Sequence, residues 1–156
     1  MAIAITLQEY LDNAGVEYDL IEHPYSSTSM QAAQAAHVPG DRIAKSVLLE
    51  DEHGYVLAVI PATHRLDLGN VHRQLNRMVG LATERELADV FADCEEGAVP
   101  PLGQPYGVEV IIDESLAWQP DIYFEAGDHV DLVHITGEAF QDLLGDVEQG
   151  QFSRHL

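Results

Sequence analysis

Lys45 is the only lysine in this chain of 156 residues, and it stands in the stretch from Arg42 to Pro61. Two apolar runs in this stretch, Ala44 to Leu49 and Tyr55 to Ile60, flank a polar connection that ends in glycine. The pattern predicts a β-hairpin, and the continuous apolar runs indicate strands that are covered on both faces. An ammonium at the edge of such a strand either binds a carbonyl, carboxylate or phosphate in a cleft, or extends past apolar surface to water.

A second candidate for chemistry is the loop CEEGAVPPLG, which begins at Cys94. Proline restricts φ and glycine lets a backbone approach a ligand, so the N–H groups after Gly97 could bind an oxyanion or a carbonyl. The same composition also suits a plain connection between two elements. Cys94 is followed by Glu95 and Glu96, whose charges disfavour a thiolate, so we interpret the cysteine as a core residue.

Other common site types are not indicated. Histidine and aspartate gather between His64 and His72 and again between Asp128 and His134, but neither region has HExxH or CxxC spacing. Glycine-rich phosphate motifs, a GxSxG elbow and the aromatic and basic pattern of RNA-recognition modules are also missing. We therefore expect no metal and no cofactor.

The composition favours one compact domain. Hydrophobic residues make up 46% of the chain, and the formal net charge is −20. No apolar run approaches the roughly 18 residues that span a membrane, and a single cysteine agrees with a reducing compartment. We expect a cytoplasmic protein with no membrane or DNA partner, because so acidic a chain repels phosphate backbones unless a local basic patch opposes the average.

The elements that must position Lys45 and the loop follow from periodicity and from capping residues. Helices are expected at Thr6–Gly15, in the alanine-rich segment after Thr28, and after Thr136. A further helix should present Val71, Leu75 and Met78 on one face. Another should begin at the capping box of Thr83 and Glu86 and end near Asp93. Further strands are expected at Val16–Ile21, Val108–Ile112, Asp121–Phe124 and Val130–Ile135. We predict a loop over Pro61–Leu68 and a polar tail over 146–156. This order predicts an α+β fold, a single compact domain over residues 1–145 with a curved, mixed β-sheet flanked by helices.

Taken together, these motifs resemble the YbaK/prolyl-tRNA synthetase-associated domain family, whose members hydrolyse mischarged aminoacyl-tRNA. The resemblance covers residues 5–144 and is carried by several short motifs in order. They are EHP at Glu22–Pro24, Thr28 with the alanine-rich helix, RIAKSVLL around Lys45, AVIPA at Ala58–Ala62, the Gly97-x-x-x-Pro101 motif, VIIDESL at Val110–Leu116, and the turn Glu125–Gly127.

The resemblance implies a trans-editing aminoacyl-tRNA deacylase with the family's curved, mixed sheet. Lys45 would hold the 3′-terminal adenosine of a mischarged tRNA near the ester, and the backbone from Gly97 to Pro101 would position the aminoacyl carbonyl. A ribose hydroxyl and a water would supply much of the chemistry, without a protein nucleophile, metal or cofactor. An aminoacyl-tRNA synthetase would be a further partner.

The pocket residues implied by the resemblance include two departures from the family pattern. Ser46 follows the lysine where threonine or asparagine is common, and the pair Asp128-His129 replaces a small or basic pair. The other substrate-binding residues that we expect are Tyr25, Ser26, Thr28, Ala98, Val99 and Pro100. Packing and helix capping are the alternative roles of Tyr25, Ser26, Thr28, Asp128 and His129. A small, proline-lined pocket would admit alanine, serine, cysteine or threonine without ranking them.

A different class of function also fits the sequence. The net charge of −20 favours a binding module of the same fold that recognises a small amino-acid-like ligand or a protein partner, without efficient hydrolysis. A neutral or positive surface around Lys45, Arg42, Arg65 and Arg73 would favour the deacylase instead.

Overall fold

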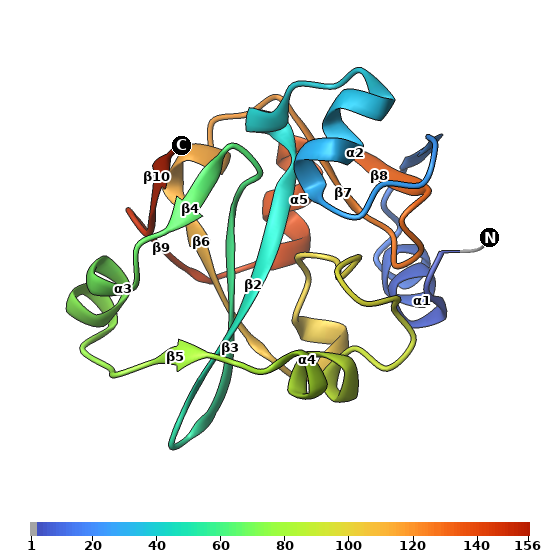
Figure 1. The fold of residues 1–156 in the computed structure, drawn as a ribbon. Coiled ribbons are helices and arrows are strands. Elements are labelled where there is room, and N and C mark those ends of the chain that lie inside the picture. The colour runs from blue at the N-terminus through green and yellow to red at the C-terminus, as the bar shows by residue number, and fades with distance from the viewer. Residues whose placement is uncertain (1–2) are drawn as a thin grey trace.

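The hairpin predicted around Lys45 lies at the centre of the fold in the computed structural model, which describes residues 3–156 (Figure 1). Its strands, β2 (Ala44–Asp51) and β3 (Gly54–Pro61), pair antiparallel along their whole length. The side chain of Asp51 closes the turn by accepting hydrogen bonds from the N–H groups of His53 and Gly54, at 2.8 and 3.0 Å. The predicted hairpin is therefore confirmed.

Helices flank this hairpin, and three of them begin at a threonine cap. They are α1 (Ile5–Asn13), α2 (Ser29–Ala36), η1 (Gly40–Arg42), α3 (Leu68–Leu75), α4 (Glu84–Val90), η2 (Gln104–Tyr106), η3 (Glu114–Leu116) and α5 (Gly137–Leu144). The predicted caps are confirmed: Thr28 caps α2, Thr136 caps α5, and Thr83 forms a capping box with Glu86 at α4. Within residues 3–156, no helix combines the length and apolar composition that a membrane crossing needs.

Hydrogen bonding arranges the strands in three groups. The strands other than β2 and β3 are β1 (Asp19–Glu22), β4 (His64–Leu66), β5 (Gly80–Leu81), β6 (Glu109–Asp113), β7 (Asp121–Glu125), β8 (Asp131–Thr136), β9 (Glu148–Gly150) and β10 (Ser153–His155). A mixed sheet has the order β5-β2-β3-β6-β9, an antiparallel sheet the order β1-β8-β7, and β4 pairs with β10. A single bridge between Ile43 and Tyr123 joins the first two sheets. The predicted α+β class with a mixed sheet flanked by helices is confirmed, and the bridge links this sheet to a separate antiparallel sheet.

The core lies on both faces of β3. Residues 56–60 are fully buried without interruption. Leu57 and Val59 belong to the largest apolar cluster, together with side chains from α1, β7, β8 and α5, whereas Val56 and Ala58 belong to a second cluster with residues of α3. The continuous apolar run of β3 is explained by this burial on two sides.

Three predictions about local structure are wrong. The segment Pro61–Leu68 is not only loop, because it contains β4. Met78 does not share a face with Val71, because α3 ends at Leu75 and Met78 is 79% exposed. The expected polar tail, residues 146–156, forms β9 and β10. Strands of three residues are too short to show an alternating pattern, and β9 and β10 form only because distant segments, β6 and β4, pair with them.

Candidate functional site

Lys45 and Ser46 project from opposite faces of β2, as successive residues of a strand do. The ammonium of Lys45 donates to the carbonyl of Ala62 at 3.4 Å, so it lies against the turn between β3 and β4. The hydroxyl of Ser46 donates to the carbonyl of Val99 at 3.4 Å. Ser46, rather than Lys45, therefore makes the contact between β2 and the loop of the Gly97-x-x-x-Pro101 motif.

The environment of Lys45 suits a cation that binds a ligand. Its side chain is half-buried, and desolvation lowers its pKa from the ordinary value of a lysine. An ammonium has three donors, and the single long contact with Ala62 leaves donors free. Lys45 can therefore donate to an anionic or carbonyl oxygen that approaches from the β3–β4 side.

Backbone hydrogen bonds fix the conformation of the loop after Cys94. The N–H of Glu95 donates to the carbonyl of Gly127 at 2.8 Å, and the N–H of Ala98 donates back to Glu95 at 3.0 Å. Gly97 has φ +82°, which is strained for any residue with a Cβ. The amide of Ala98 is thus already occupied and is not a free oxyanion donor.

The side chains that follow Gly97 are not open pocket walls. Ala98, Val99, Pro100 and Pro101 are all buried, and Val99 packs in the largest apolar cluster. The side chains of these residues pack into the protein interior and fix the position of the loop. Any contact of theirs with a ligand would come from the backbone, as the resemblance implies for Gly97 and Pro101.

His129 joins two of the predicted segments. Its buried ring lies against the carbonyl of Ser26 at 2.9 Å through Nδ1 and against the carbonyl of Glu96 through Nε2. A Cβ added to Gly97 would lie 3.3 Å from this ring. His129 therefore ties the Gly97 loop to the segment after β1.

The segment after β1 provides an exposed aromatic side chain. Tyr25 is 65% exposed, and its ring centroid lies 5.1 Å from that of His129. The hydroxyl of Ser26 donates to the carbonyl of Pro24 at 3.0 Å, and the hydroxyl of Thr28 accepts from the N–H of Gln31 at 3.1 Å. Ser26 and Thr28 thus have local turn and capping roles, which leaves Tyr25 as the available side chain.

Asp128 belongs to a buried acidic group that includes two residues the sequence analysis did not select. Its Oδ1 accepts from the N–H groups of Val130 and Asp131 at 3.1 and 2.9 Å. Burial, together with the charge of Asp128, raises the pKa of Glu125 to about 8. Burial and the hydrogen bond to Asp128 raise the pKa of Asp131 to about 7. Glu125 was visible in the sequence only as part of a turn motif, and its burial depends on the packing of β7.

Replacing Glu125 with glutamine is expected to flatten the pH dependence of stability. Because the folded-state pKa is raised above that of the unfolded chain, the contribution of Glu125 is fully present below about pH 4.5 and is lost as pH rises through about 8. In that window the wild type should lose up to about 1.4 kcal/mol of unfolding free energy per pH unit through this group. Urea unfolding at several pH values would measure it, with exposed Glu17→Gln as the control. Parallel curves for wild type and Glu125→Gln would contradict the assignment.

The structure offers no strong candidate for a cysteine nucleophile or for a metal site in the described residues. Burial raises the pKa of the Cys94 thiol to about 11, so the thiolate is scarce near neutral pH. Among residues 3–156, no three His, Cys, Asp or Glu side chains are grouped so that they could hold a metal ion. A depression of about 560 Å³ lies between α1 and α5, away from the residues above. A smaller one, of about 210 Å³, is lined by Ser46 and by residues of α4.

Comparison with known proteins identifies the family. Residues 23–143 match the family model of the aminoacyl-tRNA editing domain. The chain is 29% identical over 118 residues to a proline–tRNA ligase of Geobacillus thermodenitrificans, which covers 75% of this chain and 21% of the ligase. The chain thus spans about a fifth of that relative's length.

Solved structures show the same fold over nearly the whole chain. A proposed trans-editing enzyme for prolyl-tRNA synthetase has a TM-score of 0.84 and 27% identity, with 97% of this chain and 96% of the other covered. A scaffold protein used for computational epitope grafting has a TM-score of 0.84 and 25% identity, with 98% and 97% covered. Since the family model spans most of the sequence, this chain belongs to the aminoacyl-tRNA editing domain family.

Proposed function

We propose that this protein is an aminoacyl-tRNA deacylase that acts in trans on tRNA mischarged with a small amino acid of the alanine, serine, cysteine or threonine class. The observation that carries the proposal is that a chain of the editing domain family has its single lysine, the half-buried Lys45, in the strand position where that family has a lysine. The similarity to a proline–tRNA ligase and to a proposed prolyl trans-editing enzyme makes tRNA for proline the first substrate to test.

In the proposed reaction, water attacks the ester carbonyl carbon and the bond from that carbon to the ribose oxygen breaks. The ribose oxygen takes up a proton, which releases the free amino acid and an intact 3′ end. Lys45 holds the terminal adenosine and offers positive charge, while the backbone from Gly97 to Pro101 positions the carbonyl. An aminoacyl ester is already activated, so positioning and charge stabilisation supply the rate without a protein nucleophile.

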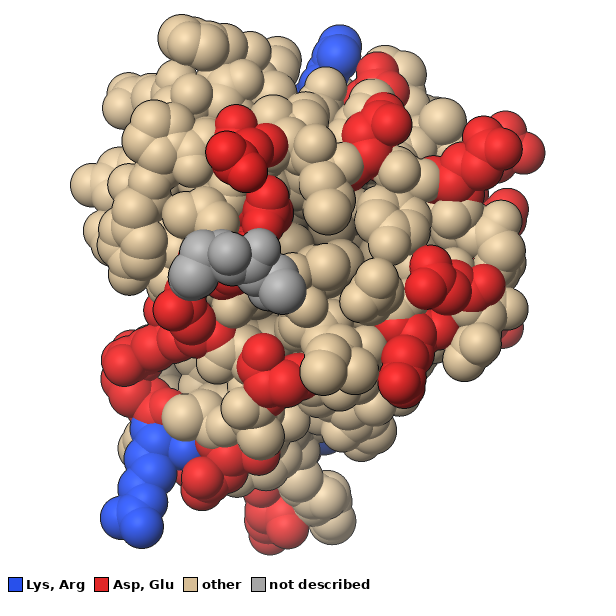
Figure 2. Space-filling view, turned by 90° about the vertical axis from the view of Figure 1, so that its right-hand side faces the viewer, with Lys and Arg blue, Asp and Glu red and all other residues tan. Residues whose placement is uncertain are grey.

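A binding module remains the second candidate, because a large acidic surface favours it. Figure 2 shows Asp and Glu spread over the face on which α1 lies, with Lys or Arg only at its margins. Such a face repels a phosphate backbone. The same fold without hydrolysis would recognise an amino-acid-like ligand or a protein partner.

Deacylation of a panel of charged tRNAs separates the two candidates. Transcripts of tRNA for proline and for alanine, each charged with alanine, serine, cysteine, threonine or proline, would be incubated with the protein. We expect release of at least one small amino acid from a tRNA that is not its own, well above the rate of spontaneous ester hydrolysis. Release of none of them would refute the deacylase and leave the binding module.

A further inference from the structure

Two arginines face each other across the ribbon formed by β4 and β10. In the register of this pair Arg65 lies opposite Arg154, and His64 lies opposite His155. Both arginines are exposed. Like charges directly opposite on paired strands destabilise the pairing, and a bound anion removes that repulsion. The ribbon thus places two exposed arginines side by side in a chain whose net charge is −20.

Within residues 3–156, acidic side chains near the ribbon pair with Arg154 and His155 but not with Arg65. Nε of Arg154 lies 3.5 Å from Asp67, and Nε2 of His155 lies 3.8 Å from Asp41. In the part of the chain that the structure describes, Arg65 has no acidic partner. Its guanidinium is thus available to a ligand such as a phosphate, which arginine binds with paired donors.

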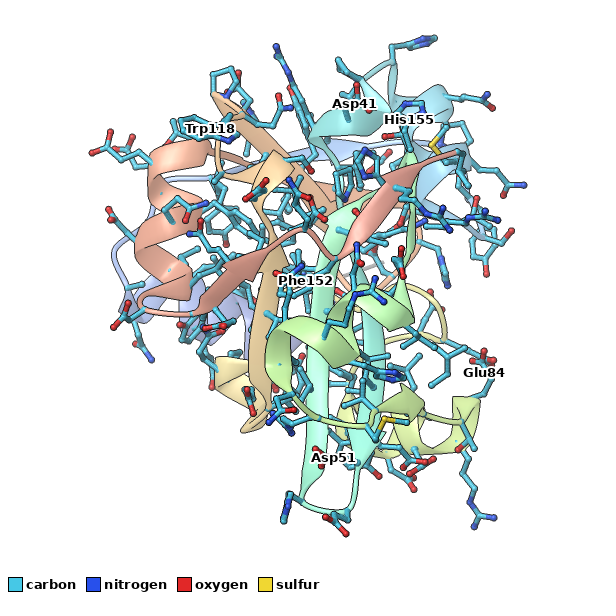
Figure 3. The ribbon with its side chains drawn as sticks, turned by 90° about the vertical axis from the view of Figure 1, so that its left-hand side faces the viewer. Asp41, Asp51, Glu84, Trp118, Phe152 and His155 are labelled. Carbon is cyan, nitrogen blue, oxygen red and sulfur yellow. The ribbon has the colours of Figure 1, made fainter. Side chains whose placement is uncertain are left out.

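An exposed aromatic side chain lies beside Arg154. Trp118 is 83% exposed, the highest value among the large apolar side chains described. With Arg154, Asn70, Ser115, Gln151 and Ser153 it lines a depression of about 460 Å³, whose wall also includes the carboxylates of Asp113 and Glu114. Trp118 and His155 both appear on the face shown in Figure 3. Exposed aromatic rings beside arginine are platforms on which unpaired bases of a nucleic acid stack.

The position of this face relative to Lys45 and to the acidic surface also fits an RNA. Figures 2 and 3 view opposite sides of the molecule, so the ribbon lies on the side away from the acidic face that Figure 2 shows. The Ala62 carbonyl that Lys45 contacts is two residues before β4 begins. A phosphate chain on the ribbon would therefore continue toward Lys45 past Asp41, without crossing the acidic face of Figure 2.

We propose that the β4–β10 ribbon, with Arg65, Arg154 and Trp118, docks the acceptor end of the tRNA through its phosphates and one unpaired base. The identity of this RNA rests on the proposed function. Arg154 lies outside the residues that the family model matches, 23–143, so the surface depends on a segment beyond the family's shared pattern.

Binding of uncharged tRNA for proline tests the docking surface without requiring hydrolysis. Fluorescence anisotropy over a range of salt concentrations would compare wild type with the double variant Arg65→Ala/Arg154→Ala and with Trp118→Ala. We expect the double variant to bind about tenfold more weakly at low salt, with the slope of log Kd against log salt reduced by about 2. Trp118→Ala should weaken binding about tenfold and leave the slope unchanged.

Control variants test whether the loss of tRNA affinity is specific to the arginines of the ribbon. Arg85→Ala removes an exposed arginine of α4, and it should bind as the wild type does. The double variant Arg65→Lys/Arg154→Lys keeps the charge and should retain most of the affinity and the slope. Thermal unfolding checks that all variants are folded. An unchanged Kd and slope in the Arg65→Ala/Arg154→Ala protein, or an equal loss in Arg85→Ala, would overturn the proposal.

Hydrolysis of 3′-aminoacyl-adenosine separates this inference from the proposed function. This substrate has the ester but not the acceptor-stem phosphates, so the double alanine variant should hydrolyse it as fast as the wild type does. Loss of tRNA affinity with full activity on the adenosine ester supports both proposals. No hydrolysis of any ester by the wild type, together with arginine-dependent tRNA binding, would reject the deacylase and keep the docking surface.

Discussion

Replacing Lys45 with alanine is expected to lower kcat/KM for hydrolysis of the preferred aminoacyl-tRNA by about 10²–10³-fold, the usual effect of removing one well-placed charged donor. The side chain is half-buried, so its charge acts through a medium that screens it less than water does. In addition, the chain has no other lysine that could take its place. The measurement is steady-state hydrolysis with the spontaneous rate subtracted.

Two matched variants make the result specific to the ammonium of Lys45. Lys45→Arg keeps a positive charge near the same position and should retain more activity than Lys45→Ala. Arg85→Ala removes an exposed cation of α4 and should leave kcat/KM unchanged. If Lys45→Ala retained activity within threefold of wild type, Lys45 would have no direct role, even if the protein were a deacylase.

The same experiment at several pH values tests whether the charged form of Lys45 is required. Because burial lowers the pKa of Lys45, the protonated form is lost at a lower pH than in an ordinary lysine. The enzymatic rate of the wild type should therefore fall as pH rises through this lowered pKa. An arginine stays protonated throughout, so Lys45→Arg should not show that alkaline decline.

The second large effect concerns stability. Phe152→Ala is expected to lower the free energy of unfolding by about 3–5 kcal/mol, as for other fully buried aromatic residues. Phe152 is completely buried against Val71 and Ile111. Its N–H donates to Asp113 Oδ2 at 2.9 Å, and its carbonyl accepts from the N–H of Asp67 at 2.7 Å. The side chain is labelled at the centre of the face in Figure 3.

Urea unfolding measures this effect against two controls. Phe152→Leu keeps most of the buried apolar surface and should cost clearly less than alanine does. Leu156→Ala changes a side chain that is 71% exposed and should have almost no effect. A loss below about 1 kcal/mol for Phe152→Ala would mean that residues 146–156 contribute little to the fold, contrary to the packing observed.

Phe152 also links stability to the docking surface. The residue lies between β9 and β10, and Arg154 belongs to β10. Loosening of this segment would therefore displace Arg154 from Arg65, so Phe152 variants are unsuitable for testing RNA binding. The exposed arginine variants are suitable because they leave the buried contacts of Phe152 in place.

Local sequence patterns determined the central hairpin, the capped helices and the position of Lys45 on a strand. These features depend on contacts between residues near one another in the chain, such as the Thr83 and Glu86 capping box or the turn at Asp51. The motif order also indicated the family, which the family model confirms. The roles of Lys45 and of the Gly97 loop in catalysis stay predictions.

Tertiary structure decided what surrounds those residues. Three features depend on segments that are far apart in the sequence. They are the contact between Ser46 and Val99, the contacts of His129 with Ser26 and Glu96, and the burial of Glu125. The same is true of β10, which is a strand because β4 pairs with it. A pattern of a few residues carries no information about a partner that lies 90 positions away, roughly the separation of these two strands. The amino-acid sequence alone thus indicated the family and predicted the residues for its chemistry, whereas only the folded chain brought Arg154 opposite Arg65.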